Sequence, residues 1–196
     1  MKKNRRSFLF TILIVFTGLL QINATVKLPA VFGDNMVLQQ QSNAPVWGTA
    51  VPGSTVKIST SWNGKRYSVK TGDDGHWKIR VATPEAGGPY EIDISDGDKV
   101  TLENVLIGEV WVCSGQSNMQ MPMKGYRNQP VFGANEDVAT SLNENIRLFT
   151  VERNKTLKPL QDFEGEWKKC KPENVVDFSA TAYYFGRMIE KALNVP

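Results

Sequence analysis

Hydrophobic and polar residues alternate along the first half of the chain, in short runs separated by turn residues. The segment Tyr90-Glu91-Ile92-Asp93-Ile94 is typical of these runs. Such alternation predicts half-buried β-strands. Three dipeptides, Asn63-Gly64, Asp74-Gly75 and Asp96-Gly97, are hairpin-turn signals between the runs. Short strands at this spacing predict a β-sandwich domain over residues 25–105.

After about residue 105 the pattern changes. The run from Val105 to Cys113 is apolar except at Gly108-Glu109, which predicts a strand buried on both faces. A second strand is expected at Ile146–Val151, and a helix near residues 135–142. Strands that alternate with helices are typical of the start of a doubly wound α/β domain, which we assign to residues 106–196.

The segment from Ser179 to Asn194 is the clearest predicted helix. Ser179 is a favourable N-cap residue. Ala182, Phe185 and Ile189 recur at helical spacing and predict one buried face. A parallel sheet of only two strands cannot bury its faces. We therefore expect the α/β domain to be truncated in this sequence.

Residues 1–24 have the pattern of a signal peptide. Four basic residues precede an apolar stretch over residues 7–20, and Ala24 offers a cleavage position. The stretch is shorter than the ~20 apolar residues that span a bilayer, although an uncleaved anchor remains the alternative. We expect an exported protein, periplasmic or extracellular, with no stable membrane partner after cleavage.

The charge balance depends on this leader. Without its four basic residues, 19 of the 23 Lys and Arg remain against 20 Asp and Glu, a net charge of about −1. The apparent basicity therefore belongs to the export signal, and a nucleic-acid partner is not expected.

A small polar segment, Ser114–Asn118, follows the run that ends at Cys113. A Gly two residues before a Ser after a strand is how α/β hydrolases expose a nucleophilic hydroxyl, which makes Ser117 the candidate nucleophile. Met119 stands where the five-residue lipase elbow has its last Gly, which argues against the ordinary lipase-type elbow. The alternative is an ordinary capping loop between a strand and a helix.

Four blocks of the sequence resemble one family. They are Val31–Gln40, Pro45–Gly48, Gly108–Met119 and Ser179–Arg187. In this order they resemble the N-terminal portion of the sialate O-acetylesterase family, part of the SGNH hydrolase group. The resemblance implies a flavodoxin-like α/β hydrolase domain, a serine hydrolase mechanism and an O-acetylated sugar substrate. It implies Ser117 as nucleophile, with Gly115, Gln116 and Asn118 as motif or oxyanion-loop positions.

The partners that would activate Ser117 are missing from this sequence. In the family the base is a His close after an Asp, in a later region that these residues do not include. The one histidine, His76, falls in a turn of the β-rich region. Because a serine nucleophile needs a base, we expect this chain alone to be inactive. Further oxyanion donors also belong to later blocks.

No metal or other cofactor is expected, because there is one His and no Cys-x-x-Cys. Cys113 and Cys170 could pair in an exported protein, or remain two separate buried thiols. Two other functions stay open: a carbohydrate-binding module that uses the five tryptophans, and a structural, adhesin-like sandwich. The acyl sugar and the oligomeric state are not assigned.

Overall fold

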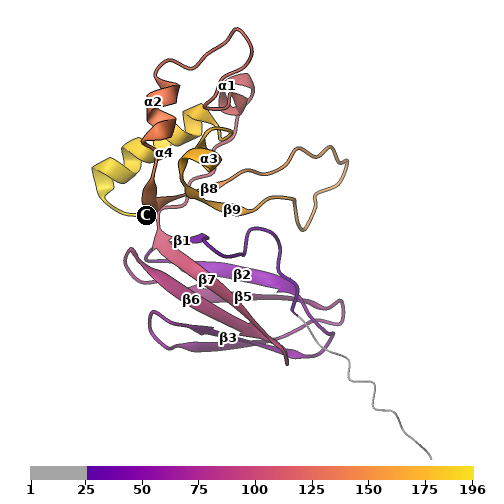
Figure 1. Cartoon of the computed structure of the whole chain (residues 1–196). Helices are drawn as coiled ribbons and strands as arrows, with labels where there is room; N and C mark the ends of the chain where they lie inside the picture. The colour runs from indigo at the N-terminus through magenta and orange to yellow at the C-terminus, as the bar shows by residue number, and fades with distance from the viewer. Residues whose placement is uncertain (1–25) are drawn as a thin grey trace, which may run out of the picture.

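The computed structural model describes residues 26–196, and its β-rich part is built on a curled, mixed five-stranded sheet (Figure 1). Only the β1–β7 pair is parallel; the other neighbours are antiparallel. In spatial order the strands are β1 (Val37–Gln39), β7 (Lys99–Gly108), β6 (Gly87–Ser95), β3 (Thr55–Thr60) and β4 (Arg66–Lys70). A separate antiparallel pair comprises β2 (Asn43–Thr49) and β5 (His76–Ala82).

One hydrophobic core joins the five-stranded sheet to the β2–β5 pair. Val46 and Val81 come from the pair, and Ile58, Ile94 and Val105 come from the sheet; each is at most 1% exposed. Burial alternates along β3 and along most of β2, as the sequence pattern predicts. The mostly β architecture of the first half of the chain is therefore confirmed.

Two of the three hairpin predictions are confirmed. Asn63-Gly64 joins the antiparallel pair β3–β4, and Asp96-Gly97 joins β6–β7. Asp74-Gly75 leads instead from β4 to β5, which pairs with β2. This turn therefore carries the chain from one sheet to the other. Gly75 has φ +76°, and a Cβ there would lie 2.9 Å from the Ala50 carbonyl oxygen, so both conformation and space require glycine.

The predicted buried strand over residues 105–113 is correct only as far as Gly108, where β7 ends. Residues 109–116 form no strand, and Val112 is 92% exposed. The apolar composition of Val110–Cys113 led to the wrong prediction, because residues 26–196 leave all four of these side chains exposed.

The remaining part of the described chain contains one small sheet and four helices, two of them single turns. Strands β8 (Asn143–Phe149) and β9 (Trp167–Cys170) pair antiparallel. The helices are α1 (Ser117–Gln120), α2 (Ala134–Ala139), α3 (Pro172–Val175) and α4 (Ala180–Leu193). A second core, which includes Met123, Leu148, Val175 and Tyr183, holds them together.

These elements confirm the predicted helices near residues 135–142 and 179–194, and they confirm a strand at residues 146–149. The predicted doubly wound sheet is not formed within residues 26–196, because β8 pairs antiparallel with β9. A full α/β hydrolase fold is therefore not present in the described part of the chain.

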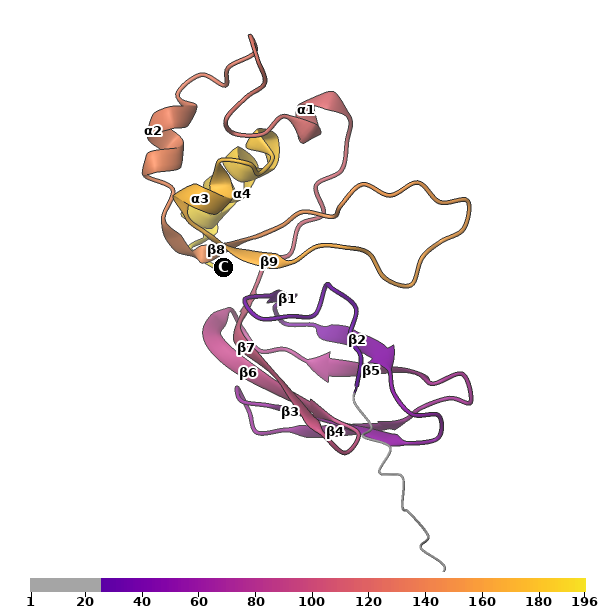
Figure 2. The same cartoon turned by 45° about the vertical axis from the view of Figure 1, so that its right-hand side comes forward.

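The two parts of the molecule are tied together beside β1 (Figure 2). The Trp167 indole N–H donates to the Val31 carbonyl oxygen at 2.8 Å, and the Ala30 N–H donates to Asp162 Oδ1 at 2.9 Å. Both bonds link the loop before β1 to the β8–β9 hairpin. The hairpin is thus fixed on the β-rich part at two separate points.

Both cysteines are free thiols. Cys170 is buried, and burial raises the pKa of its thiol to about 11. Cys113 is exposed, so its predicted burial is wrong, for the same reason as for Val112. Among residues 26–196 no helix is long and apolar enough to cross a membrane. The predicted signal peptide, residues 1–24, lies outside the described residues.

Candidate active site

The candidate nucleophile, Ser117, is the first residue of the one-turn helix α1 and is exposed to solvent. The turn is closed by two hydrogen bonds, from the Gln120 N–H to the Gln116 carbonyl and from the Met121 N–H to the Ser117 carbonyl, both 3.1 Å. A Cβ at Gly115 would lie 3.0 Å from Met119 Cβ. Glycine therefore lets the chain turn closely into α1 and present the Ser117 hydroxyl.

Helix α1 is attached to the start of α4. The Thr181 hydroxyl donates to the Asn118 carbonyl at 3.1 Å, and the Ala180 N–H donates to the Met121 carbonyl at 2.8 Å. These contacts join two segments that are about 60 residues apart in sequence. The nucleophile loop is therefore held by backbone and hydroxyl hydrogen bonds rather than by burial.

The Ser179 side chain contacts both α4 and α1. Its side-chain oxygen accepts a hydrogen bond from the Ala182 N–H at 3.3 Å and so caps α4, as the sequence predicts. The same hydroxyl lies 3.4 Å from Met119 Sδ. Because Met119 is on α1, the cap of α4 also sets the position of the helix that carries Ser117.

An ion pair connects α4 to α2. Asp137 accepts a hydrogen bond from the Arg187 guanidinium at 2.6 Å and from the Tyr184 hydroxyl at 2.7 Å. These bonds hold the pKa of Asp137 below its usual value. Burial, together with the Asp137 bond, raises the pKa of Tyr184 to about 12. Near neutral pH the Asp137 carboxylate is therefore charged and the Tyr184 phenol is neutral.

Two glutamines hold the start of the segment that leads from β7 to Ser117. Gln39 and Gln40 donate to the two Glu109 carboxylate oxygens at 3.0 and 2.8 Å. The bonds from Gln40 and Gln39 hold the pKa of Glu109 below its usual range. Gln39 also accepts the Val110 N–H at 3.0 Å. The direction in which the chain leaves β7 is thereby fixed by Gln39, the last residue of β1, and by Gln40, which follows it.

Two of the family-like blocks contact opposite ends of a third. The block that ends at Gln40 binds Glu109, and the block that begins at Ser179 contacts Asn118 and Met119. The block Pro45–Gly48 lies in β2, where Val46 packs in the β-rich core. Gly115, Gln116, Ser117 and Asn118 lie in one exposed turn, which the start of α4 supports.

The structure separates His76 from Ser117. His76 begins β5 in the β-rich part, and α1 lies at the opposite end of the molecule (Figure 1). Within residues 26–196 the Ser117 hydroxyl has no hydrogen-bond partner. The side chains of Gln116 and Asn118 are likewise free of such bonds in this range. His76 is therefore placed to flank a turn and not to activate Ser117.

Sequence reasoning missed two residues beside α1. Arg153 donates to the Gln120 side-chain oxygen at 2.5 Å, and the Tyr126 hydroxyl donates to the Gln120 carbonyl at 3.1 Å. Both lie in loops without periodic structure, so no local pattern singles them out. They place a cation and a phenol three residues from the candidate nucleophile.

The tryptophans do not form an exposed platform. Trp47, Trp62, Trp77 and Trp167 all pack in or against the β-rich core. Trp111, 54% exposed, is the exception within the described chain. Residues 26–196 also contain no group of three or more His, Cys, Asp or Glu side chains arranged to hold a metal ion.

Comparisons with known proteins agree on one group. The sequence matches no protein-family model. It is 29% identical over 180 residues to rat sialate O-acetylesterase, an alignment that covers 82% of this chain and 32% of that protein. It is 30% identical over 183 residues to the human sialate O-acetylesterase, covering 83% of this chain and 34% of that protein.

A solved structure gives the same result. The crystal structure of a carbohydrate acetylesterase from Xanthomonas citri superposes with a TM-score of 0.81 and 32% identity. The match covers 88% of this chain and 39% of that chain. This chain thus spans about a third of the length of the curated relatives it matches. It is homologous to the N-terminal region of the sialate O-acetylesterases.

Proposed function

We propose that this chain supplies the nucleophile of a secreted carbohydrate O-acetylesterase that acts on O-acetylated sialic acids or related sugars. The observation that carries the proposal is the exposed Ser117 hydroxyl at the head of α1, in a turn that the start of α4 holds by hydrogen bonds. Homology to sialate O-acetylesterases supports the reaction class. Residues 1–24 support export to the periplasm or beyond.

In this reaction the Ser117 oxygen attacks the carbonyl carbon of the acetyl ester, and the carbonyl oxygen becomes an oxyanion. The intermediate collapses, the sugar hydroxyl leaves with a proton, and the acetyl group stays on Ser117 until water hydrolyses it. The first N–H groups of α1 have no partner within their own helix. The Ser117 N–H is therefore available to the oxyanion.

The base for this reaction comes from outside these residues. The sequence contains one histidine, and His76 lies in the other part of the molecule. Removing one member of a catalytic triad costs on the order of several powers of ten in kcat. We therefore infer that these residues alone hydrolyse acetyl esters slowly or not at all.

A chimera tests the proposal. Residues 25–196 are joined to the part of the Xanthomonas citri acetylesterase that follows the matched region, and hydrolysis of p-nitrophenyl acetate is measured. We expect Ser117→Ala to lower kcat at least about 1,000-fold. Ser114→Ala, in the same exposed loop, is the matched control and should retain activity, as should His76→Ala. Full activity in the Ser117→Ala chimera would refute Ser117 as nucleophile.

The substrate class is tested with the same chimera. Release of acetate from O-acetylated sialic acid, compared with acetylated neutral sugars, reports which sugar is preferred. A pure carbohydrate-binding role would instead give sugar binding that does not depend on Ser117. That alternative lacks support from the tryptophans, because four of the five are packed against the core.

A further inference from the structure

A cation beside the nucleophile turn has no anionic partner. The Arg153 guanidinium donates to the Gln120 side-chain oxygen at 2.5 Å, and both side chains are exposed. Among residues 26–196 Arg153 forms no ion pair. Gln120 is a neutral amide, so it accepts a hydrogen bond but leaves the charge uncompensated. A guanidinium carries several N–H donors, and those of Arg153 that do not bind Gln120 are available to an anion.

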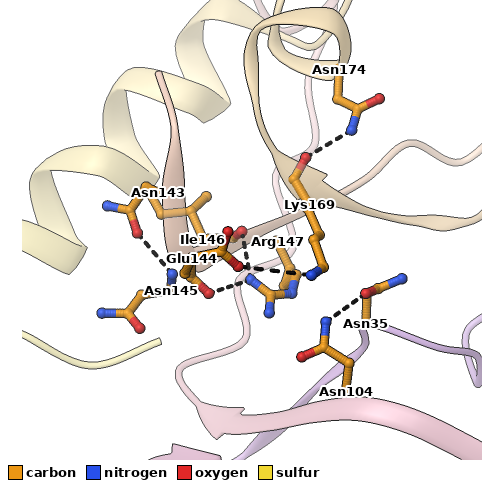
Figure 3. A network of polar contacts seen from close by, with 9 residues as sticks. All are labelled: Asn35, Asn104, Asn143, Glu144, Asn145, Ile146, Arg147, Lys169 and Asn174. Atoms are coloured by element: carbon orange, nitrogen blue, oxygen red, sulfur yellow. Dashed lines mark hydrogen bonds and ion pairs between the residues drawn. The ribbon is translucent and has the colours of Figure 1, made fainter. Parts of the chain in front are cut away.

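Other cations of the β8–β9 hairpin find acceptors within the chain. Figure 3 shows Arg147 of β8, which donates to the Ile146 carbonyl oxygen at 3.2 Å. It also shows Lys169 of β9, whose ammonium pairs with the Glu144 carboxylate at 3.8 Å. Arg153 lies in the loop between these strands and differs, because its one hydrogen bond in the described chain goes to an uncharged side chain. The uncompensated charge is therefore found on the side of the hairpin that faces α1.

Helix α1 places this cation on the same side as Ser117. Ser117 and Gln120 are the first and last residues of α1, three positions apart. Side chains at this spacing share one face of a helix, with Cβ atoms about 5–6 Å apart. Because Gln120 binds Arg153, the guanidinium lies next to the face that carries the Ser117 hydroxyl. A sugar whose acetyl ester lies at Ser117 can therefore bring a second group to Arg153.

The loop that carries Arg153 is closed at its base. The Glu152 N–H donates to the Glu164 carbonyl oxygen at 2.9 Å and ties the two limbs of the loop together. Phe149 precedes the loop and packs edge to face on Phe163 of the returning limb, with ring centroids 5.8 Å apart. Arg153 follows directly after the tied residue. Contacts within the hairpin therefore position its backbone before any ligand binds, which lowers the cost of binding.

Two further groups beside Arg153 suit a sugar. The side-chain N–H groups of Gln120 make no hydrogen bond within residues 26–196 and are additional free donors. The Tyr126 hydroxyl donates to the Gln120 carbonyl oxygen at 3.1 Å, and the residue is 47% exposed. Its ring offers an apolar face with a polar group at one end. A cation, an amide donor and an aromatic ring are thus gathered around the last residue of α1.

We propose that Arg153 binds the carboxylate of an O-acetylated acidic sugar and so makes the esterase prefer acetylated sialic acids to acetylated neutral sugars. The inference rests on the proposed function. A guanidinium and a carboxylate form paired, charge-assisted N–H···O bonds, which a neutral sugar cannot form. In a sialic acid the carboxylate is separate from the hydroxyl groups that carry acetyl esters, so Ser117 and Arg153 contact different parts of one molecule. Arg153 is thus a specificity-determining residue and takes no part in proton transfer.

Acetate release by the chimera measures this preference. The substrates are an O-acetylated sialic acid and the same compound with its carboxylate converted to a methyl ester, which keeps the acetyl group and loses the charge. We expect kcat/KM to be at least about tenfold higher for the acid, because the ester lacks the charged partner of Arg153. Arg153→Gln should remove that preference, mainly by raising KM for the acid.

Lys155→Gln is the matched control. Lys155 lies in the same exposed loop, forms no ion pair in the described part of the chain, and loses the same charge on substitution. This variant should keep the preference of the parent chimera. Arg153→Lys retains the charge but not the planar fork, so it should show an intermediate preference. Equal losses in the two Gln variants would show that only the net charge of the loop matters, and would overturn the assignment of Arg153.

Binding without turnover makes the test independent of the nucleophile. In a Ser117→Ala chimera, titration calorimetry should show at least about tenfold tighter binding of the acid than of its methyl ester, and Arg153→Gln should abolish the difference. Equal affinities for acid and ester would refute the carboxylate site, as would a preference that survives Arg153→Gln. Ser117-dependent hydrolysis without a preference for the acid would refute this inference and leave the proposed function standing. A preference that needs Arg153, with hydrolysis that does not need Ser117, would support the site and refute the proposed nucleophile.

Discussion

The two parts of the molecule differ in how completely they bury their apolar side chains. Among the large hydrophobic residues of the β-rich part, residues 26–108, Val51 alone is exposed, at 36%. In residues 109–196 the exposed group is much larger, and it includes Val112, Phe132, Leu142, Leu157 and Met188. The first part therefore buries its apolar side chains in a closed core, whereas the second part leaves many of them exposed.

This difference indicates what each part contributes. A closed core of strands gives a rigid support that does not depend on other segments. The second part has a small core around Met123, Val175 and Tyr183, and it places the nucleophile turn on that core. Its exposed apolar residues lie outside this core. Substitutions in the two parts should therefore have different effects.

The largest effect is expected in the closed core. Ile94 is fully buried in the β-rich cluster, and Ile94→Ala should lower the free energy of unfolding by about 3 kcal/mol, through lost burial and the cavity left behind. Urea unfolding of the full chain, followed by tryptophan fluorescence, measures this change. Ile94→Val, the conservative control, should cost about 1 kcal/mol. An Ala variant as stable as the parent would show that this core is not the main support.

A smaller effect is expected from the ion pair between α2 and α4. Asp137→Asn removes the charged partner of Arg187 and should lower stability by about 1–2 kcal/mol at pH 7. Because the pKa of Asp137 is below its usual 3.8 in the folded state, its contribution is present above about pH 4 and is lost at lower pH. Urea midpoints of parent and variant should therefore converge as pH falls from 5 to 3. A constant difference would exclude the carboxylate charge as the cause.

The cap of α4 should contribute about 1 kcal/mol. Ser179→Ala removes the acceptor for the Ala182 N–H, whereas Ser179→Asp retains an acceptor at the same position. We therefore expect destabilisation for the Ala variant and little change for the Asp variant. Ser179→Ala should also speed amide hydrogen exchange in α1, because the Ser179 hydroxyl contacts Met119. Unchanged exchange in α1 would mean that the two helices are coupled in another way.

The smallest effect is expected on the open surface. Val112→Ser replaces a 92% exposed apolar residue and should change the free energy of unfolding of the isolated chain by less than about 0.5 kcal/mol. The variant should also bind less of a hydrophobic dye, because it removes exposed apolar area. A large loss of stability would indicate that residues 109–113 pack more tightly than the structure describes.

Much of the fold could be predicted from local pattern. Alternation in β3 and the turns at Asn63-Gly64 and Asp96-Gly97 depend on neighbouring residues alone, so the sequence carries their full signal. The helix capped by Ser179 is equally local. The sequence did not predict which elements pair with one another. Asp74-Gly75 has the residues of a hairpin turn, but pairing with β2 is decided by contacts 30 residues away.

The candidate site was predicted in part for the same reason. Gly115 and Ser117 lie two residues apart in sequence, so their shared turn could be inferred from a short motif. The supports at Gln39, Thr181 and Arg153 come from distant segments and leave no periodic trace. Burial of Val110–Cys113 failed because apolar composition reports which side chains favour a core and not whether the described chain supplies one.

The junction between the two parts has a practical consequence for protein engineering. Gln39 and Gln40, at the end of β1, fix the chain at Glu109, and the Trp167 indole fixes the β8–β9 hairpin on the loop before β1. With both contacts in place, the number of residues between Glu109 and Ser117 determines where Ser117 lies. Insertions at the Asn63-Gly64 turn should be tolerated, whereas one added residue between Glu109 and Ser117 would shift the nucleophile out of register with its surroundings.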